Sequence, residues 1–522
     1  MWPISKCSCL LASIALWAAS AVGATVTGTV KGPDGAPFEG AFVQAQNSKT
    51  KIMVSVLSDR QGHYRINDLP AGEYRLQIRA VGFKADPRAG MALATDQNAS
   101  VDFPLQKGVV HWNEISMYQG VKLFPEGKGK DVLTGRCFAC HGFESRMASV
   151  RRDEAGWRDR VNYMREAMGF FLNNPRNPFT DQNADDVASY INSLFGEESI
   201  LPASPADMPQ YKNLVHPPFA DEAMKIVYVE YELPGPNRMP WSAAPDKDGN
   251  LWMPYYGRAN MIGRLDPKTA EVKEFPVPNQ GSAGVHSAVM APDGFVWLTE
   301  QGSNKLGRWD PTTQKITEYQ DDAGKHTVRI GPSGEIWFSG ARGSFDPKTG
   351  KFSHYDGGAY GIALDRHGNA WYASGDDLVR VDGETRKITK WQPPTHNNNF
   401  NRRIQVDTDD TVWFAEFNHG ILTSFDPATE KFKEYQLPGP DPTPYALVID
   451  KDHNIWYSSE YTDVIGRLDP KTGQVLEYPF DHAENTMREF FIDAQGHTWY
   501  GTPANNKVGY FYIASNNERA SK

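Results

Sequence analysis

The amino-acid sequence predicts a multidomain, mainly β protein that consists of a small β-sandwich, an all-α domain and a seven-bladed β-propeller closed by an N-terminal strand. Three observations predict it: strand-length runs between glycine-rich turns, a change to helical periodicity, and seven similar repeats. At 522 residues the chain is too long for one hydrophobic core. The expected divisions are a signal peptide at 1–24, the sandwich at 25–107, the helical domain at 108–198, a linker at 199–224, the propeller at 225–514 and a tail at 515–522.

The first 24 residues have the layout of a secretory signal peptide. Lys6 precedes an apolar stretch from about Leu10 to Trp17, and small residues follow it. No later stretch approaches the roughly 20 apolar residues that a membrane-spanning helix needs. The formal net charge of −10 argues against a nucleic-acid or anionic-membrane partner. We therefore expect a periplasmic or secreted protein without a membrane span.

The segment after the signal peptide alternates apolar and polar residues between turns such as "PDG", "RQG" and "LPAG". Short runs of this kind predict a small antiparallel sandwich. The pattern "GTVKGPDGAP", "GHYRI" and "LPAGEY" resembles the carboxypeptidase regulatory-like domains over nearly the whole segment. The resemblance implies a fold used as a scaffold or adhesion unit, and no particular activity.

Helical periodicity begins after about Val109. Trp157, Val161, Met164 and Met168 are spaced to share one face of a helix. A second helix is predicted from the cap at Thr180 and Asp181, followed by an apolar face made of Val187, Tyr190, Ile191 and Leu194. The proline-rich stretch that comes next reads as a linker.

Seven repeats fill the remainder of the chain. Each holds several short strands around a tryptophan, at intervals of 34 to 45 residues, which is typical of a β-propeller. The seventh repeat lacks its outer strand, and "IVYVEYELPGP" before the first repeat nearly duplicates the outer strand "KFKEYQLPGP". We therefore expect this N-terminal strand to close the ring. The anchor tryptophans are Trp252, Trp297, Trp337, Trp371, Trp413, Trp456 and Trp499.

The stretch "RCFACHGFE" contains the only cysteines outside the first ten residues. In C-x-x-C-H the two thiols, Cys137 and Cys140, add to the haem vinyl groups and the imidazole of His141 binds the iron. A zinc site would need further Cys or His ligands that the helical segment lacks. A redox or structural dithiol is the alternative, although the expected βαβ setting is absent. The motif therefore predicts one covalent haem c.

The helical segment resembles a class I cytochrome c: a helix enters "TGRCFACHG", and the helix "ADDVASYINSLFG" would pack across it. The resemblance implies a methionine on the other side of the iron. Met147, Met164 and Met168 are the candidates, and we favour Met164 because it shares a helical stripe with Trp157. His141 and Met164 would then be the axial iron ligands, with Met168 as the alternative.

Eleven residues before each anchor tryptophan, the repeats carry large polar or aromatic side chains. Equivalent positions of a radial repeat lie on a ring, so we expect them around one mouth of the central channel. Such a mouth predicts a substrate-binding site, although channel mouths are wet and accept polar residues without a function. The seven residues are Trp241, His286, His326, Tyr360, Arg402, Tyr445 and Arg488.

The repeats, with inner strands such as "VWLTE" and turns such as "NKLGRWDPTT", resemble the virginiamycin B lyase (streptogramin lyase) family over residues 226 to 512. In those lyases a histidine at the mouth acts as general base, and an acidic residue fourteen positions later helps to hold Mg²⁺. His286 and Glu300 match this pair and imply a divalent metal at the mouth. However, Gly284 stands where the lyases have a second metal-binding Glu, and Trp241 stands where they have another His, so lyase activity is not expected to transfer.

These observations predict an exported c-type haem protein that transfers electrons, coupled to substrate binding or oxidation at the propeller mouth. It could be a periplasmic oxidoreductase or the haem subunit of one, with a redox partner protein. The alternative is a binding propeller with an accessory haem and no catalysis; a C–O lyase is the third hypothesis. The ligand at the propeller would be a small molecule, a glycan or a peptide.

Overall fold

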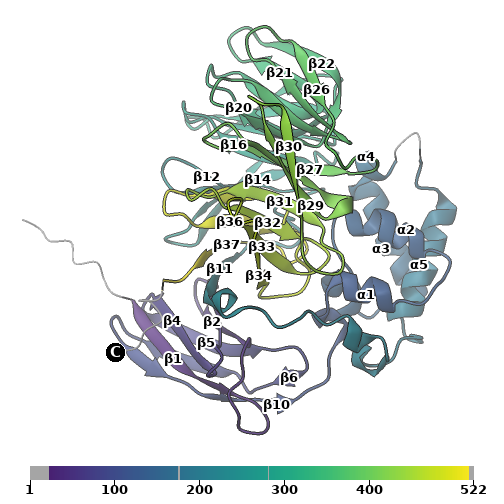
Figure 1. The fold of residues 1–522 in the computed structure, drawn as a ribbon. Coiled ribbons are helices and arrows are strands. Elements are labelled where there is room, and N and C mark those ends of the chain that lie inside the picture. Colours follow the sequence, from purple (N-terminus) through teal and green to yellow (C-terminus); the bar gives the residue numbers. More distant parts are fainter. Residues whose placement is uncertain (1–22, 174–176, 280, 516–522) are drawn as a thin grey trace, which may run out of the picture.

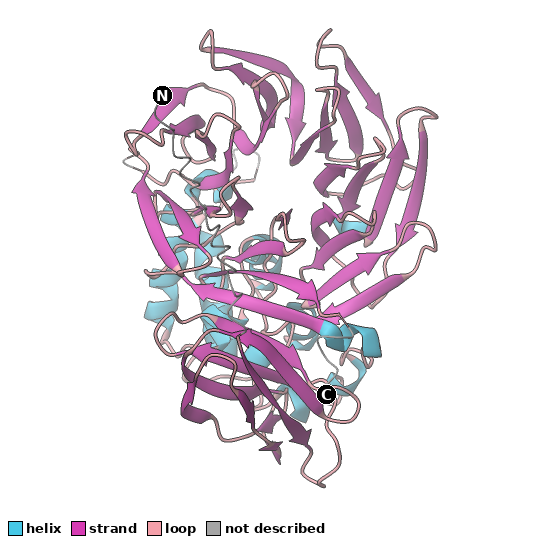
Figure 2. Cartoon of the chain, turned by 90° about the vertical axis from the view of Figure 1, so that its left-hand side faces the viewer, coloured by secondary structure: helices cyan, strands magenta, loops and turns pink. Residues whose placement is uncertain are grey.

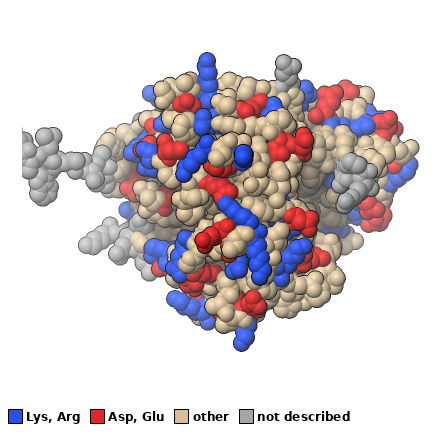
Figure 3. Space-filling model, turned by 90° about the horizontal axis from the view of Figure 1, so that it is seen from above, with Lys and Arg blue, Asp and Glu red and all other residues tan. Residues whose placement is uncertain are grey.

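The computed structural model describes residues 23–173, 177–279 and 281–515. The N-terminal strands form one end of the molecule, the repeat strands form most of the rest, and the helices cover one flank (Figure 1). The predicted signal peptide lies almost entirely outside the described residues. Within those three ranges, no helix is long and apolar enough to cross a membrane. The face in Figure 3 carries basic and acidic side chains interspersed, with no extended patch of one sign.

The N-terminal strands form two sheets that share a core. Val26 and Ile66 from one sheet and Val43 and Leu76 from the other are fully buried in it. The first sheet contains β1 (Ala24–Lys31), β4 (His63–Leu69), β8 (Asn98–Ser100) and β9 (Phe103–Pro104), and the second contains β2 (Phe42–Asn47), β3 (Met53–Leu57), β5 (Gly72–Arg79) and β7 (Arg88–Leu93). A separate pair joins β6 (Phe83–Lys84) to β10 (Gln106–Lys107).

Six of the seven repeats form separate antiparallel sheets of three or four strands, and the sheets fan out from one another (Figure 2). In order they are β12 (Ala244–Pro245) to β13 (Leu251–Pro254), β14 (Met261–Asp266) and β15 (Glu271–Pro276); β16 (Val285–Met290), β17 (Val296–Glu300), β18 (Lys305–Trp309) and β19 (Ile316–Gln320); β20 (Lys325–Ile330), β21 (Ile336–Asp346) and β22 (Lys351–Ala359); β23 (Gly361–Leu364), β24 (Ala370–Ser374), β25 (Asp377–Val381) and β26 (Ile388–Trp391); β27 (Asn401–Val406), β28 (Val412–Glu416), β29 (Ile421–Asp426) and β30 (Lys431–Gln436); and β31 (Pro444–Ile449), β32 (Ile455–Ser459), β33 (Val464–Leu468) and β34 (Val475–Pro479).

The anchor tryptophans hold the repeat sheets together as predicted. All seven are buried, and they pack against aromatic side chains of the same or the neighbouring sheet. In four repeats the indole N–H donates to the aspartate six positions earlier, for example Trp252 to Asp246 at 3.0 Å and Trp371 to Asp365 at 2.9 Å. The aspartate also caps the preceding turn, so one residue fixes both the turn and the tryptophan.

The prediction of a seven-bladed propeller closed by its N-terminal strand is wrong, because none of the sheets formed by the described residues closes. The strand β11 (Ile226–Glu232) does pair with β37 (Lys507–Ile513) of the last repeat. Its other edge pairs with β3, so the last repeat belongs to an eight-stranded sheet with the order β35-β36-β37-β11-β3-β2-β5-β7. The strands β35 (Phe491–Ile492) and β36 (Thr498–Thr502) complete it. Pairing two exposed edges satisfies the backbone groups of both sheets.

The prediction of an all-α cytochrome c domain is also wrong, because the described residues show no separate unit of that kind. The helices are α1 (Met117–Leu123), α2 (Lys130–Arg136), α3 (Glu154–Ala167), α4 (Gly169–Leu172) and α5 (Asp181–Phe195). Their core continues into the predicted linker through Tyr211 and Leu214, and a second apolar cluster joins Met168 to Trp241 of the repeats. Local periodicity locates helices, but it does not tell whether they pack as a unit of their own.

Candidate functional site

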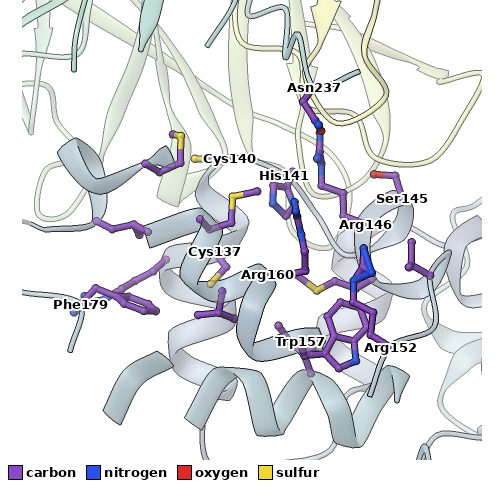
Figure 4. Close-up of a pocket in the computed structure, with 18 of the residues that line it drawn as sticks. Cys137, Cys140, His141, Ser145, Arg146, Arg152, Trp157, Arg160, Phe179 and Asn237 are labelled. Carbon is purple, nitrogen blue, oxygen red and sulfur yellow. The ribbon is translucent and has the colours of Figure 1, made fainter. Parts of the chain in front are cut away.

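A cavity of about 380 Å³ lies among the helices, within the range of small-molecule sites. Cys137, Cys140 and His141 border it together, with Trp157 and Arg160 also on its wall (Figure 4). The structure therefore brings the predicted haem-binding residues to one cavity. The other lining residues are Arg136, Ser145, Arg146, Met147, Val150, Arg152, Val161, Met164, Met168, Phe171, Leu172, Phe179, Ile191 and Asn237.

The end of α2 positions the two thiols. The backbone N–H of Cys137 donates to the carbonyl of Leu133 and closes the helix, and a single 3₁₀ turn then leads to Cys140. Both cysteines are free. Burial raises the pKa of Cys137 to about 12 and that of Cys140 to about 11. Because a reactive dithiol needs a lowered thiol pKa, these values argue against the redox-dithiol alternative.

His141 is oriented as an iron ligand requires. Its side chain is buried, and Nδ1 lies 2.7 Å from the carbonyl oxygen of Gly142, which can only accept. Nδ1 therefore carries the proton, and Nε2 keeps its lone pair. Burial and the nearby Arg146 guanidinium lower the pKa of His141 to about 3. The imidazole is therefore neutral at ordinary pH, which is the form that binds a metal.

All three candidate methionines line the same cavity. Met164 lies on α3 with Trp157 and Val161, as the periodicity predicts, and both of those side chains are buried. Met168 ends this helix and packs against the repeat sheets, whereas Met147 belongs to the core of the helical segment. The choice of Met164 as axial ligand remains a prediction, with Met147 and Met168 as alternatives.

Four buried donors on the cavity wall have no hydrogen-bond partner within the described part of the chain. They are Nε of Arg146, Nε of Arg152, Nε1 of Trp157 and Oγ of Ser145. Unpaired donors of this kind are costly unless a ligand satisfies them. The propionates of a haem are anions that these donors can bind, so the cavity fits the group that the cysteines would attach.

Sequence reasoning did not identify the cavity arginines. The basic stretch "SRMASVRRDEAGWRDR" contains three of them and was the available signal. Arg136, Arg146, Arg152 and Arg160 line the cavity, and no acidic side chain does. Arginines on a helix usually lie on a solvated face, so only the fold shows that these surround one space.

The seven predicted mouth residues are brought together, but they are buried rather than open. Arg488 is 0%, His286 1% and Trp241 3% exposed, and only Tyr360 is partly exposed. Trp241 shares an apolar cluster with Met168, and Cys140, Met164 and Phe170 pack against that cluster. The helical segment therefore packs over the side of the repeat sheets where Trp241 lies.

Direct contacts link these residues in series. The Trp241 indole N–H donates to His286 Nε2 at 2.9 Å, and the ring centroids of His286 and His326 lie 3.6 Å apart. The ring centroids of His326 and Tyr360 lie 4.3 Å apart, and the hydroxyls of Tyr360 and Tyr445 form a hydrogen bond. The remaining two are arginines that stack on aromatic rings: Arg402 on Tyr360 and Tyr445, and Arg488 on Trp241 and Tyr445.

His286, the predicted general base, is not free to accept a proton from a substrate. The Trp241 indole occupies the lone pair of His286 Nε2, and burial with the neighbouring His326 lowers the pKa of His286 well below its usual value. Glu300 is fully buried and accepts a hydrogen bond from Ser303 at 2.9 Å. Two groups of possible metal ligands occur among the described residues, and neither contains His286, His326 or Glu300.

The position of the missing lyase carboxylate is filled by the helical segment. A Cβ added at Gly284 would lie 2.6 Å from the Phe170 ring, and Gly284 has φ +55°. Phe170 also approaches Gly302. No glutamate fits at position 284 while α4 is docked, so the second carboxylate of a lyase-type metal site has no room here.

Gly284→Ala is expected to lower the free energy of unfolding by about 1–3 kcal/mol, because the new methyl group clashes with Phe170 and favours a different backbone conformation. Urea denaturation measures the change. Adding Phe170→Ala should relieve part of it, and Gly281→Ala, where a Cβ meets nothing within 4 Å, is the control. Equal stabilities for Gly284→Ala and Gly281→Ala would contradict the close packing of Phe170.

Glu300→Gln is expected to stabilise the protein at pH 8 but not at pH 4. Burial and the neighbouring Glu318 raise the pKa of Glu300 to about 8 in the folded chain. Because the pKa of Glu300 is higher in the folded chain than in the unfolded chain, the folded protein loses stability as the pH rises from the unfolded pKa towards 8. Glutamine does not ionise, so the variant avoids this loss. The gain should be on the order of 2 kcal/mol at pH 8, measured by urea denaturation at both pH values. The exposed Glu271→Gln serves as control, and a gain that does not depend on pH would refute the assignment.

Comparison with known proteins agrees with the repeat sheets and the N-terminal strands. The carboxypeptidase regulatory-like domain matches residues 25–106, and the virginiamycin B lyase family matches residues 224–348 and 345–518. No curated protein is similar enough to count as a relative.

Two solved structures resemble the repeat part of the chain. Selenomethionine-substituted virginiamycin B lyase from Staphylococcus aureus is 23% identical, with a TM-score of 0.51 over 55% of this chain and 100% of its own. A streptogramin B lyase is 24% identical, with a TM-score of 0.52 over 56% of this chain and 100% of its own. At this identity the likeness concerns the fold alone. Because the family match covers more than half of its residues, the chain belongs to the virginiamycin B lyase family.

Proposed function

We propose that the chain is an exported c-type haem protein that exchanges electrons with a redox partner protein, and that its repeat sheets form a binding module rather than a lyase site. The observation that carries the proposal is the single cavity that Cys137, Cys140 and His141 share with three methionines and four arginines. When bound, haem supplies one-electron oxidation and reduction at its iron.

Each part of the cavity has a role in holding the group. The thiols of Cys137 and Cys140 would form the thioether links, and His141 would bind the iron through Nε2. Apolar side chains such as Trp157, Val161 and Ile191 line the wall and limit the access of water. An iron with His and Met ligands in apolar surroundings favours a relatively high potential.

The same geometry supports recognition rather than cleavage by the repeats. Phe170 occupies the notch at Gly284, and Trp241 engages His286, so a lyase-type metal site cannot assemble at the covered mouth. A small-molecule, glycan or peptide ligand would then bind elsewhere on the repeat sheets. A periplasmic oxidoreductase remains the second candidate, supported by the contact between the cavity residues and the buried Trp241–His286 pair.

The test is the visible spectrum of the protein, produced in a host that matures c-type haem, in oxidised and reduced forms, with a denaturing gel stained for haem. We expect a haem-positive band, a sharp α-band on reduction and the weak far-red band of Met–iron ligation. Met164→Leu should remove the far-red band without loss of covalent haem, whereas Met147→Leu and Met168→Leu should keep it. A wild-type protein without covalent haem would refute the proposal, and loss of the band in Met168→Leu alone would move the axial ligand to Met168.

A further inference from the structure

A second cluster of metal-ligand side chains lies where the last repeat joins the N-terminal sheet, and it contains none of the residues that line the haem cavity. Glu230 is on β11, and Asp481 and His482 follow β34. One ligand atom from each lies within 4.8 Å of the other two. Glu230 and Asp481 are buried at 1% and 0% exposure, and the side chain of His482 is 16% exposed.

The distances suit a small divalent ion. His482 Nε2 lies 2.9 Å from Glu230 Oε1 and 3.8 Å from Asp481 Oδ1. An ion bound to nitrogen and oxygen at about 2.0–2.2 Å places neighbouring ligand atoms roughly 3.0–3.6 Å apart. The three ligand atoms are therefore close to the spacing that one shared ion requires.

Asp481 is the observation that points to a ligand. Its carboxylate is fully buried, and neither oxygen has a hydrogen-bond partner among the described residues. The Ser55 hydroxyl interacts with it, but no close hydrogen bond joins the two side chains. A buried carboxylate without donors is expensive unless it is paired or coordinates a metal. The weak 3.8 Å contact with His482 does not replace those donors.

Surrounding contacts orient the other two side chains towards the same point. His482 Nδ1 lies 3.0 Å from the carbonyl oxygen of Ala483 and 3.1 Å from Nδ2 of Asn505, so these two contacts engage Nδ1, and Nε2 is the ring nitrogen that faces Glu230. Lys507 Nζ lies 2.9 Å from Glu230 Oε2, so Oε1 is the carboxylate oxygen that faces His482. The Tyr500 hydroxyl donates to Oε1 at 3.3 Å.

We propose that Glu230, Asp481 and His482 bind one divalent metal ion of the zinc class. Mixed imidazole and carboxylate ligands favour zinc over calcium or magnesium, which prefer oxygen ligands alone. The ion would tie the connection after β34 to β11 and so reinforce the junction of the last repeat with the N-terminal sheet. Without a metal, the same residues would be an ion-pair network in which His482 and Lys507 offset the two carboxylates.

The experiment uses the full-length protein after treatment with a chelator and dialysis. Titration with zinc chloride in a calorimeter should show one zinc ion per chain, and zinc should raise the unfolding temperature. Asp481→Asn and His482→Gln, which keep size and polarity, should each weaken zinc binding at least tenfold. Asp409→Asn, at the exposed member of the half-buried cluster Asp407, Asp409 and His453, is the matched control and should bind zinc as the wild type does.

Zinc content by elemental analysis decides between the metal site and the ion-pair network. Wild-type protein that takes up no zinc, or takes it up without a rise in unfolding temperature, would overturn the site. So would zinc binding that is lost in Asp409→Asn but kept in the Asp481 variant. Circular dichroism identifies variants that fold; if one fails to fold, the other variant and the wild-type titration still decide. Iron is counted separately, so the result does not depend on the haem.

Discussion

Replacing Cys137 and Cys140 together by alanine is expected to abolish covalent haem while the chain still folds. The thiols form no disulfide, and both are only partly buried where they pack at the edge of apolar clusters beside the cavity, so the small change to alanine should leave the fold in place. Without thiols no thioether can form, whatever the other residues of the cavity do. A haem stain of a denaturing gel should therefore lose its band completely, and the α-band should disappear from purified protein.

Single variants separate the two attachments. Cys137→Ala and Cys140→Ala should each retain one thioether and give a weaker band, because either thiol can still add to its vinyl group. Val150→Ala is the matched control: its apolar side chain lines the same cavity but can neither attach haem nor bind its propionates, so the stain should match that of the wild type. The expectation fails if the double variant keeps a haem-positive band.

The parts of the site that the sequence predicted are those encoded within a few residues. Cys137, Cys140 and His141 lie within five residues, so a single turn sets their relative positions, and the motif alone indicates what they can bind. The stripe of Trp157, Val161 and Met164 is likewise a property of one helix. The pairing of β11 with the last repeat was also predictable, because the strand duplicates its counterparts.

The parts that could not be predicted depend on packing between distant segments. Nothing in the sequence of β11 indicates that its second edge pairs with β3, which precedes it by about 170 residues. The docking of Phe170 against Gly284 depends on how two surfaces fit together. A glycine in the sequence indicates only that a side chain would not fit at that position, and it does not identify the neighbouring residue. For this reason a ring expected to face solvent lies beneath the helices, and the sequence could not distinguish a mouth from a buried interface.

Arg488→Met is expected to lower the free energy of unfolding by about 3–5 kcal/mol, because it leaves Glu460 buried without its partner. Both residues are nearly inaccessible, at 0% and 2% exposure, and their charged atoms lie 2.5 Å apart. Adding Glu460→Gln removes the stranded charge and should recover much of the loss. Urea denaturation measures both variants. Lys451→Met, which breaks an exposed pair with Asp452, is the control and should change stability by less than about 1 kcal/mol.

The same pair should affect the potential of the proposed haem, since Arg488 and Glu460 both act electrostatically on Cys140. Removing the positive charge makes the surroundings of the attachment site more negative, which favours the oxidised iron, so the midpoint potential should fall in Arg488→Met. In Arg488→Met combined with Glu460→Gln the local charge is balanced again, and the potential should return towards the wild-type value. If Arg488→Met lowers the stability but leaves the midpoint potential unchanged, the haem lies too far from Arg488 to be influenced by its charge. If the double variant recovers both the stability and the midpoint potential, the charges of Arg488 and Glu460 act on the haem as well as on the fold.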